Sequence, residues 1–246
     1  MLVTNQIKKD LNCKDTWVVA LGLTAIGESS TEEMCRELYP EVIKTMQASS
    51  PYIRQRAALA AIRVVKNIPD VVEDFYDAIA SCMEDKNQSV VMATVSLCCE
   101  ICKLDEEHIV HFRGQHIGTL CKNLKQLLMS GYAPEYDIGG VKDPFLQVKI
   151  LELLGRLGAG NAEASDEMSD VLAQIATNTE ASKNTGNSVL SECVRTIMAI
   201  EASQGLRLLG INILGRFLVN KENNIRFVAL QQLIKVVEID YQAVQR

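Results

Sequence analysis

Apolar residues recur along this chain with the spacing of helices rather than of strands. In the stretch 143–158, apolar side chains occupy most of the helical circumference between Asp143 and Gly158. Asp followed by Pro is typical of a helix start, because Asp accepts from unpaired N–H groups and Pro lacks the N–H that would go unpaired. Gly is typical of a helix end, since it readily adopts the left-handed conformation. A helix that is apolar on nearly all sides needs neighbours on several sides.

The same pattern occurs six times. Five and eight residues after the aligned apolar residue every copy is again apolar, and four residues after it the side chain is mostly small. The aligned residues are Val18, Ile53, Val90, Leu146, Val189 and Ile225, so that successive copies are 35, 37, 56, 43 and 36 residues apart. Periods of about 34–47 residues are typical of stacked helical pairs. We therefore expect an all-α, right-handed α-solenoid of about six HEAT- or armadillo-like helical pairs. The alternative is an irregular helical domain whose helices are alike by chance.

Cap residues and apolar periodicity predict where the helices lie. The expected ranges are 1–10, 16–28, 31–47, 51–67, 70–84, 88–103, 105–129, 144–157, 165–180, 187–200, 203–219 and 223–238. Pro40 is expected to bend its helix or split it in two, and Gly114 to bend or break its helix. Asp70 and Glu73 have the spacing of a capping box. No stretch alternates as a strand would.

The chain is expected to be a single solenoid segment over residues 1–246. Neither end resembles the polar capping repeat that a solenoid needs, so both ends look truncated. The one long insertion, 130–142, contains Tyr132 and Tyr136. It is either a functional loop or a packed crossover anchored by its tyrosines, and both interpretations stay open.

Composition and charge disfavour several classes of function. The net charge of −6 disfavours a nucleic-acid binder, and no apolar run approaches the ~20 residues that span a membrane. Cys98, Cys99 and Cys102 lie near three histidines in the sequence, but the favoured interpretation is buried, reduced thiols rather than zinc ligands, since no paired ligand spacing occurs. There is no phosphate-binding glycine loop and no catalytic constellation. We expect no enzyme activity and no cofactor.

Several stretches resemble the trunk of the gamma-adaptins, which are large subunits of clathrin adaptors. They are Met129–Asp137 (MSGYAPEYD), Asp143–Leu151 (DPFLQVKIL), Thr177–Asn184 (TNTEASKN), Asn212–Leu218 (NILGRFL), Asn224–Leu230 (NIRFVAL) and Ala243–Arg246 (AVQR). The resemblance implies a scaffold for vesicle-coat assembly and cargo sorting in intracellular transport. It implies a sigma subunit, a beta-type adaptin, a medium subunit and an Arf-type GTPase as partners. It also implies a cytoplasmic protein recruited through its complex to the trans-Golgi network, endosomes and clathrin-coated vesicles. The alternative function is an unrelated helical-repeat scaffold, such as a transport receptor or a phosphatase scaffold subunit.

Basic side chains early on the second helix of each pair are the candidate partner-binding residues. They are Arg54, Arg56, Lys149 and Arg226. On an acidic protein such residues could attract acidic partner surfaces. The alternative is that they are solvated charges or ion pairs between repeats, which contribute little to binding.

Overall fold

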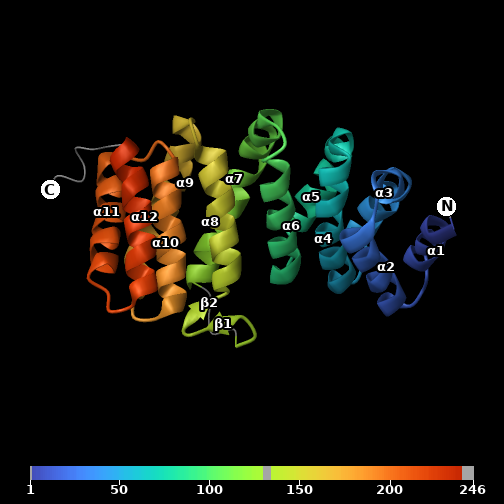
Figure 1. Cartoon of the computed structure of the whole chain (residues 1–246), viewed down its shortest axis with the longest axis horizontal. Coiled ribbons are helices and arrows are strands. Elements are labelled where there is room, and N and C mark those ends of the chain that lie inside the picture. Colours follow the sequence, from blue (N-terminus) through green and yellow to red (C-terminus); the bar gives the residue numbers. More distant parts are fainter. Residues whose placement is uncertain (1, 130–133, 240–246) are drawn as a thin grey trace. The chain divides into compact units, whose positions relative to one another are not determined.

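The computed structural model describes residues 2–129 and 134–239 (Figure 1). Within these residues the chain forms twelve α-helices, one 3-10 helix and one two-stranded hairpin, divided between two compact units, Met1–Val110 and His111–Arg246. The first unit contains α1 (Leu2–Leu11), α2 (Thr16–Ser29), α3 (Glu32–Met46), α4 (Pro51–Asn67), the 3-10 helix η1 (Pro69–Phe75), α5 (Tyr76–Met83) and α6 (Gln88–Ile101). Helix α7 (Glu106–Met129) begins in the first unit and continues in the second. The second unit then has β1 (Asp137–Ile138), β2 (Val141–Lys142), α8 (Pro144–Gly158), α9 (Ala162–Asn178), α10 (Asn184–Ala199), α11 (Gln204–Leu218) and α12 (Asn223–Ile239).

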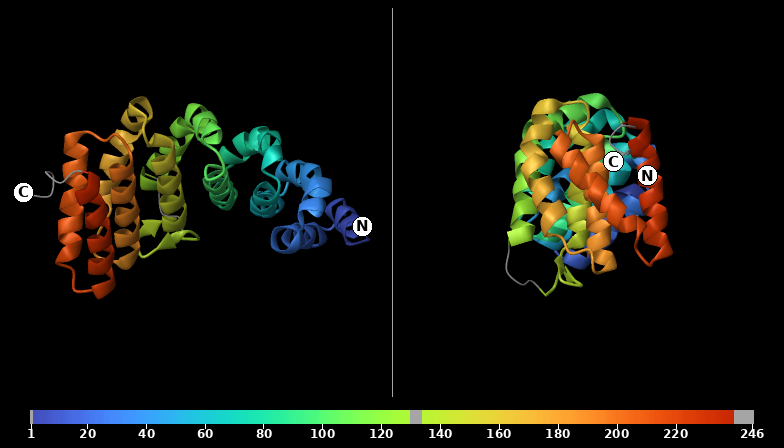
Figure 2. Two further views of the ribbon diagram at one scale, coloured as in Figure 1. Left: turned by 45° about the horizontal axis from the view of Figure 1, so that its top comes forward. Right: turned by 90° about the vertical axis from the view of Figure 1, so that its left-hand side faces the viewer.

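Helices follow one another in pairs, and the second helices of successive pairs pack side by side. In the first unit α2 packs on α4 and α4 on α6, while α1, α3 and α5 contact them from one side (Figure 2). In the second unit α8 packs on α10 and α10 contacts α12, with α9 and α11 as their partners. This arrangement places α4 and α10 between two neighbouring second helices each, as helices with broad apolar surfaces require.

Small residues allow the second helices to come close. A Cβ placed on Gly155 of α8 would lie 3.5 Å from the Thr196 Cα of α10. The Thr196 hydroxyl donates to the Leu151 carbonyl at 2.8 Å, which is a buried hydrogen bond between the two helices. Alanine would make ordinary contact at position 155, whereas a side chain larger than alanine would push α8 and α10 apart.

Gly158 is required by packing rather than by backbone conformation. The residue with positive φ at the end of α8 is Gly160, at 65°, whereas Gly158 lies within the helix. A Cβ on Gly158 would lie 2.6 Å from the Ile200 side chain. The expectation that Gly158 ends the helix in the left-handed conformation is thus wrong, because the close neighbour and not the turn selects glycine here.

The aligned positions of the repeat are buried as expected, except near the ends. Leu23, Ala58, Val95, Leu151 and Val194 are all fully buried, as are the residues three places further on in the same five copies. In the sixth copy Leu230 is 50% exposed, although Ala229 is buried. Helix α12 therefore departs from the burial pattern of the other copies, with Ala229 and Val236 buried and Leu230 and Ile234 exposed.

Two helices are not broken at residues that were expected to bend or break them. Helix α3 is not split at Pro40, because this proline is exposed and water can satisfy the carbonyl it leaves unpaired. Helix α7 is continuous through Gly114, which lowers helix stability by about 1 kcal/mol without ending the helix.

The segment after Asn67 corrects one predicted helix. Residues 69–75 form a 3-10 helix and only 76–83 are α-helical, where one helix over 70–84 was expected. The Asp70 carboxylate accepts from Arg36 Nη1 at 2.7 Å instead of from the free N–H groups of a first turn. The predicted capping box is therefore absent, because the Asp70 carboxylate forms an ion pair with Arg36 of α3 instead.

Helices α9 and α10 begin three residues earlier than predicted. Asn161 is the N-cap of α9 and accepts from the Ala164 N–H at 2.8 Å. Helix α10 begins after Lys183, so Gly186 lies inside the helix. A Cβ on Gly186 would lie 1.9 Å from the Glu180 carbonyl oxygen, which is why glycine occupies this position.

The described part of the insertion is a short ordered crossover. Residues 137–142 form an antiparallel hairpin, although no strand was expected, and Lys183 Nζ donates to the Gly139 carbonyl at 3.0 Å. Tyr136 is half-buried, and its carbonyl accepts from the Asp143 N–H at 2.8 Å. Tyr132, the other expected anchor, lies outside the described residues.

We predict that Leu151→Ala lowers the free energy of unfolding by about 2–5 kcal/mol, because it leaves a cavity in the α8–α10 interface. Leu151 is fully buried. Denaturant unfolding of wild type and variant measures the difference. Leu208→Ala on α11 is the control, since this side chain is 45% exposed. Equal effects of the two substitutions would contradict the packing described for α8.

Candidate partner-binding surface

The four basic residues predicted to bind a partner all lie on second helices. Arg54 and Arg56 lie on α4 in the first unit, Lys149 on α8 and Arg226 on α12 in the second. The structure brings the two arginines of α4 together on one helix. It places Lys149 and Arg226 on separate helices, both of which contact α10.

Arg54 makes strong contacts within the chain. Its Nε donates to Asp85 Oδ2 at 2.6 Å, and its Nη1 donates to the Ala48 and Ser49 carbonyls at 2.7 and 2.9 Å. Burial tends to raise the pKa of Asp85, but the hydrogen bonds from Arg54 and from the Asn87 N–H outweigh burial and hold the pKa below its ordinary value. Arg54 therefore holds the loop before its own helix to the loop before α6.

Arg226 and Gln147 occupy the same repeat position as Arg54 and make the same kind of contact. Arg226 Nη1 donates to the Asn220 carbonyl at 2.9 Å, six residues earlier. Gln147 Nε2 donates to the Lys142 carbonyl at 2.7 Å, five residues earlier. We call these three side chains the loop tethers, because each attaches the loop that precedes its helix.

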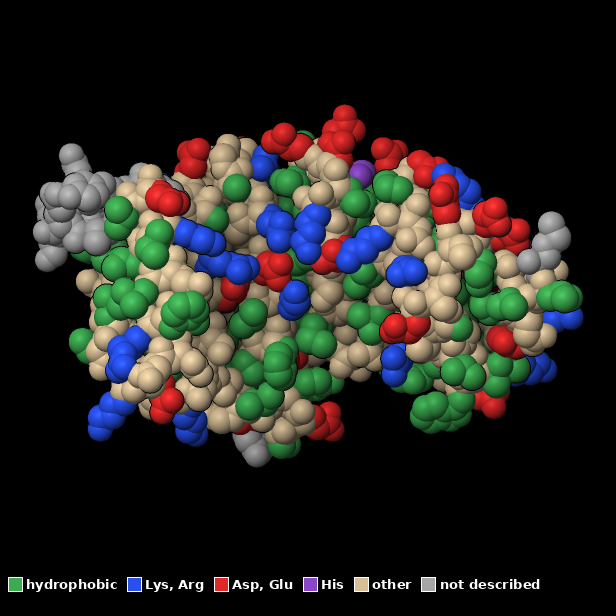
Figure 3. Space-filling model, viewed as in Figure 1, with side chains coloured by type: hydrophobic (Ala, Val, Ile, Leu, Met, Phe, Trp, Pro, Cys, Tyr) green, Lys and Arg blue, Asp and Glu red, His purple; other side chains and the backbone are tan. Residues whose placement is uncertain are grey.

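Arg56 belongs to an aromatic cluster on the surface of α2 and α4. Its guanidinium carbon lies 5.3 Å from the centroid of the Tyr52 ring, and that ring lies 5.6 Å from the Trp17 ring. Trp17 is 73% exposed and Leu21, one turn further along α2, is 70% exposed. Figure 3 shows hydrophobic side chains gathered over α2. We call Trp17, Leu21, Tyr52 and Arg56 the aromatic patch.

Sequence reasoning missed three members of the aromatic patch. Trp17 is the single tryptophan of the chain, and Leu21 follows it by four residues, outside the buried positions of the repeat. Two large apolar residues four apart on a helix share a face. A face of this kind that the repeat does not bury is a signal of a contact surface, and it could have been found in the sequence.

Lys149 lies in a cluster of charges on α8 and α10. Its Nζ is 2.9 Å from Glu152 Oε2, and Arg156 Nη2 is 3.3 Å from the other oxygen of the same carboxylate. On α10, Arg195 Nη2 lies 2.7 Å from Glu192 Oε1. Three cations thus surround two carboxylates, and Figure 3 shows basic side chains gathered over α8 and α10 with acidic ones between them. We call these five residues the basic cluster.

The two carboxylates of the basic cluster differ in pKa. Burial raises the pKa of Glu192, and the neighbouring Glu152 carboxylate adds to this rise, while Arg195 opposes it. For Glu152 burial also acts to raise the pKa, but hydrogen bonds from Lys149 and Arg156 hold it below its ordinary value. The cluster therefore keeps a positive excess that an acidic partner could contact.

Most of the cysteines are buried thiols. Seven of the eight are buried and none forms a disulfide. Burial raises the pKa of Cys82 and Cys121 to about 11 and of Cys193 to about 12. Among the residues that the structure describes, no group of three or more His, Cys, Asp or Glu side chains could hold a metal ion. His108, close in sequence to the cysteine run, is hydrogen-bonded to the Tyr76 hydroxyl at 2.7 Å.

In the described part of the chain no helix combines the length and the apolarity that crossing a bilayer requires.

Comparisons with known proteins decide the family. The adaptin N-terminal region matches residues 1–246. The chain belongs to the adaptin family. It is 50% identical to the AP-1 complex subunit gamma-1 of Arabidopsis thaliana and 43% identical to the AP-1 complex subunit gamma-like 2 of Homo sapiens, in both cases over the whole chain. It spans 28% and 31% of the length of these two relatives.

Solved structures show the same fold class for this adaptin chain. A homology model of the AP-3 complex in an intermediate open conformation matches with a TM-score of 0.76, at 21% identity, over 100% of this chain and 40% of the other. A designed armadillo repeat protein matches with a TM-score of 0.64, at 14% identity, over 94% and 98% of the two chains. The expected α-solenoid of HEAT- or armadillo-like pairs is thereby confirmed.

We predict that Arg54→Met destabilises the chain by about 2–4 kcal/mol at neutral pH, since it leaves the Asp85 carboxylate largely buried without its partner. The pKa of Asp85 is lowered in the folded state, so the stability it contributes is present above its ordinary pKa of about 4 and is lost as the pH falls through the lowered value. The difference between variant and wild type should therefore shrink in acid.

Urea unfolding at pH 7 and at about pH 3 measures this difference. Lys44→Met on α3 is the control, because its side chain is 67% exposed. An Arg54→Met effect as small as that of the control, or one that grows in acid, would show that the tether does not stabilise the fold.

Proposed function

We propose that this chain is the trunk portion of the large subunit of a clathrin adaptor and acts as a non-enzymatic scaffold. The observation that carries the proposal is the similarity to AP-1 gamma subunits, which extends over every residue of the chain. The helical pairs offer a row of second helices as an extended binding face, which is how helical-repeat proteins hold partners. The unrelated repeat scaffold considered as an alternative has no specific observation in its favour.

The proposal includes the partners of such a subunit. A sigma subunit, a beta-type adaptin and a medium subunit complete a heterotetramer, and an Arf-type GTPase recruits it to the trans-Golgi network and endosomes. The AP-1 names of the relatives support assembly with other subunits.

Affinity purification of the full chain from cells tests the scaffold role. Co-purification of a sigma subunit and a beta-type adaptin is expected. Recovery of a phosphatase subunit or a nuclear cargo in their place would overturn the proposal.

We further propose that Arg54, Arg56, Lys149 and Arg226 lie at the partner interface in two different roles. Arg54 and Arg226 fix the loops at the edge of the face, since their donors are already engaged. Arg56 and Lys149 supply direct contacts, each within its own cluster. The aromatic patch strengthens the case for Arg56, because tryptophan, tyrosine and arginine are the residues that most often dominate interface energies.

We predict that Trp17→Ala and Arg56→Glu each reduce capture of the sigma subunit at least about tenfold. Their melting temperatures should change little, because Trp17 is mostly exposed and Arg56 only half-buried. Lys149→Glu should weaken capture of an acidic partner in the same assay. Quantitative co-purification with melting curves separates the two effects.

Lys122→Glu is the matched control, because Lys122 is exposed on α7, a first helix. Capture that is unchanged in the Trp17 and Arg56 variants would remove the aromatic patch from the interface. Loss of capture together with a large drop in melting temperature would assign these residues to folding instead.

A further inference from the structure

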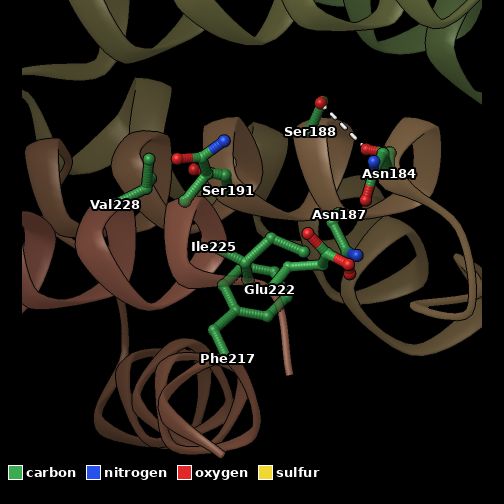
Figure 4. A pocket seen from close by; sticks show the side chains of 9 residues that line it. Asn184, Asn187, Ser188, Ser191, Phe217, Glu222, Ile225 and Val228 are labelled. Atoms are coloured by element: carbon green, nitrogen blue, oxygen red, sulfur yellow. Dashed lines mark hydrogen bonds between the residues drawn. The ribbon is translucent and has the colours of Figure 1, made fainter. Parts of the chain in front are cut away.

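A pocket of about 370 Å³ lies between α10 and α12 in the second unit (Figure 4). This volume is within the range of about 300–1,000 Å³ that is usual for ligand sites. One wall is apolar and consists of Phe217, Ile225 and Val228. The polar lining residues are Asn184, Asn187, Ser188 and Ser191 of α10, Asn224 of α12 and Glu222, which precedes α12. We call this the α10–α12 pocket.

Asn187 carries a polar atom that the fold leaves unsatisfied. The residue is 6% exposed, and its buried Oδ1 accepts no hydrogen bond from the described residues. Figure 4 shows the Asn187 side chain directed into the pocket, toward Glu222. An unpaired buried acceptor costs stability, so it calls for a donor from outside the chain.

The repeat shows that folding does not require an amide at this position. Asn187 lies two places before the aligned residue Val189, and the equivalent place in α8 is Pro144. Pro144 is buried and offers no polar side chain. The repeat therefore does not fix an amide here, because the same position holds a proline in two copies and other polar residues in three, namely Pro51, Pro144, Thr16, Gln88 and Asn223.

The lining matches a peptide group. Carboxamides and hydroxyls both donate and accept, as a peptide group does. The single charge, Glu222, lies beside the positive N-terminal ends of α10 and α12, so no net charge on a ligand is selected.

Beyond the scaffold role, we propose that the α10–α12 pocket binds an extended peptide segment of a protein partner. A peptide N–H donates to Asn187 Oδ1, and the adjacent aliphatic side chain packs against Phe217, Ile225 and Val228.

The probe for this site is N-acetyl-L-leucine N′-methylamide, which has one aliphatic side chain between two peptide groups. We expect it to bind the full chain with a Kd of about 1–10 mM, as its size allows. Saturation-transfer NMR titration measures the affinity. The analogue with ester oxygens in place of both N–H groups should bind at least about fivefold more weakly, because it cannot donate to Asn187.

Variants assign the binding to the pocket. Asn187→Leu should lower the affinity for the probe at least about tenfold. It should not lower the melting temperature, since it removes an unpaired acceptor. Thr177→Ala on α9 is the control and should bind normally, because this exposed residue does not line the pocket and its hydroxyl already donates to the Ala173 carbonyl at 2.9 Å. If Asn187→Leu lowers the melting temperature, Val228→Trp is the second test of where the probe binds. Val228 is 39% exposed, so a tryptophan side chain there can fill the pocket and should abolish binding of the probe.

Three outcomes would overturn the proposal. The first is no binding of the probe to wild type. The second is equal affinity for the probe and its ester analogue, which would show contact with the apolar wall alone. The third is binding that neither Asn187→Leu nor Val228→Trp reduces.

Discussion

Close approach between successive second helices is the constraint on which each unit depends. In the second unit α8 and α10 meet where Gly155 faces Thr196, and in the first unit a Cβ on Gly27 would lie 3.6 Å from the Ala60 Cα. Helices this close bury nearly all of their surface, so small side chains are needed at the crossing and large ones around it. The Thr196–Leu151 hydrogen bond adds a fixed register, because a shift along the helix axis would leave both groups buried and unpaired.

Once the helices are fixed in this way, the loops between them must end at defined places. The loop tethers Arg54, Gln147 and Arg226 meet this need from one repeat position, each donating to carbonyls five or six residues earlier. Arginine and glutamine can serve alike here, since the contact uses an N–H donor on a long stem and does not require charge. A basic residue at this position is therefore weak evidence for partner binding, whereas Arg56 and Lys149 lie at other positions of the helix.

The repeat made the fold largely predictable from the sequence. Apolar spacing and caps such as Asp15, Asn87 and Asp143 identified the second helices, and their side chains accept the expected N–H groups. The errors arose where tertiary contacts compete with local signals. Arg36 forms an ion pair with the Asp70 carboxylate, which therefore does not cap the predicted helix. At position 158 the close Ile200 side chain, and not a turn, requires glycine. Local sequence contains neither partner, so no local rule could have found them.

The candidate site was less predictable, because the positions that all copies of a repeat share report packing and not function. Residues that obey the pattern are explained by packing, as Leu151 is. Functional information lies in departures that packing does not need, such as an exposed Trp17 beside buried Val19, or an amide at Asn187 where α8 has a buried Pro144. Gln88 holds the equivalent place in α6, and its Oε1 is also buried without a hydrogen bond from the described residues. The same position is polar in four copies, as Thr16, Gln88, Asn187 and Asn223. In Gln88 and Asn187 it leaves a buried acceptor that only a group from outside the described chain, a ligand or a water, can satisfy.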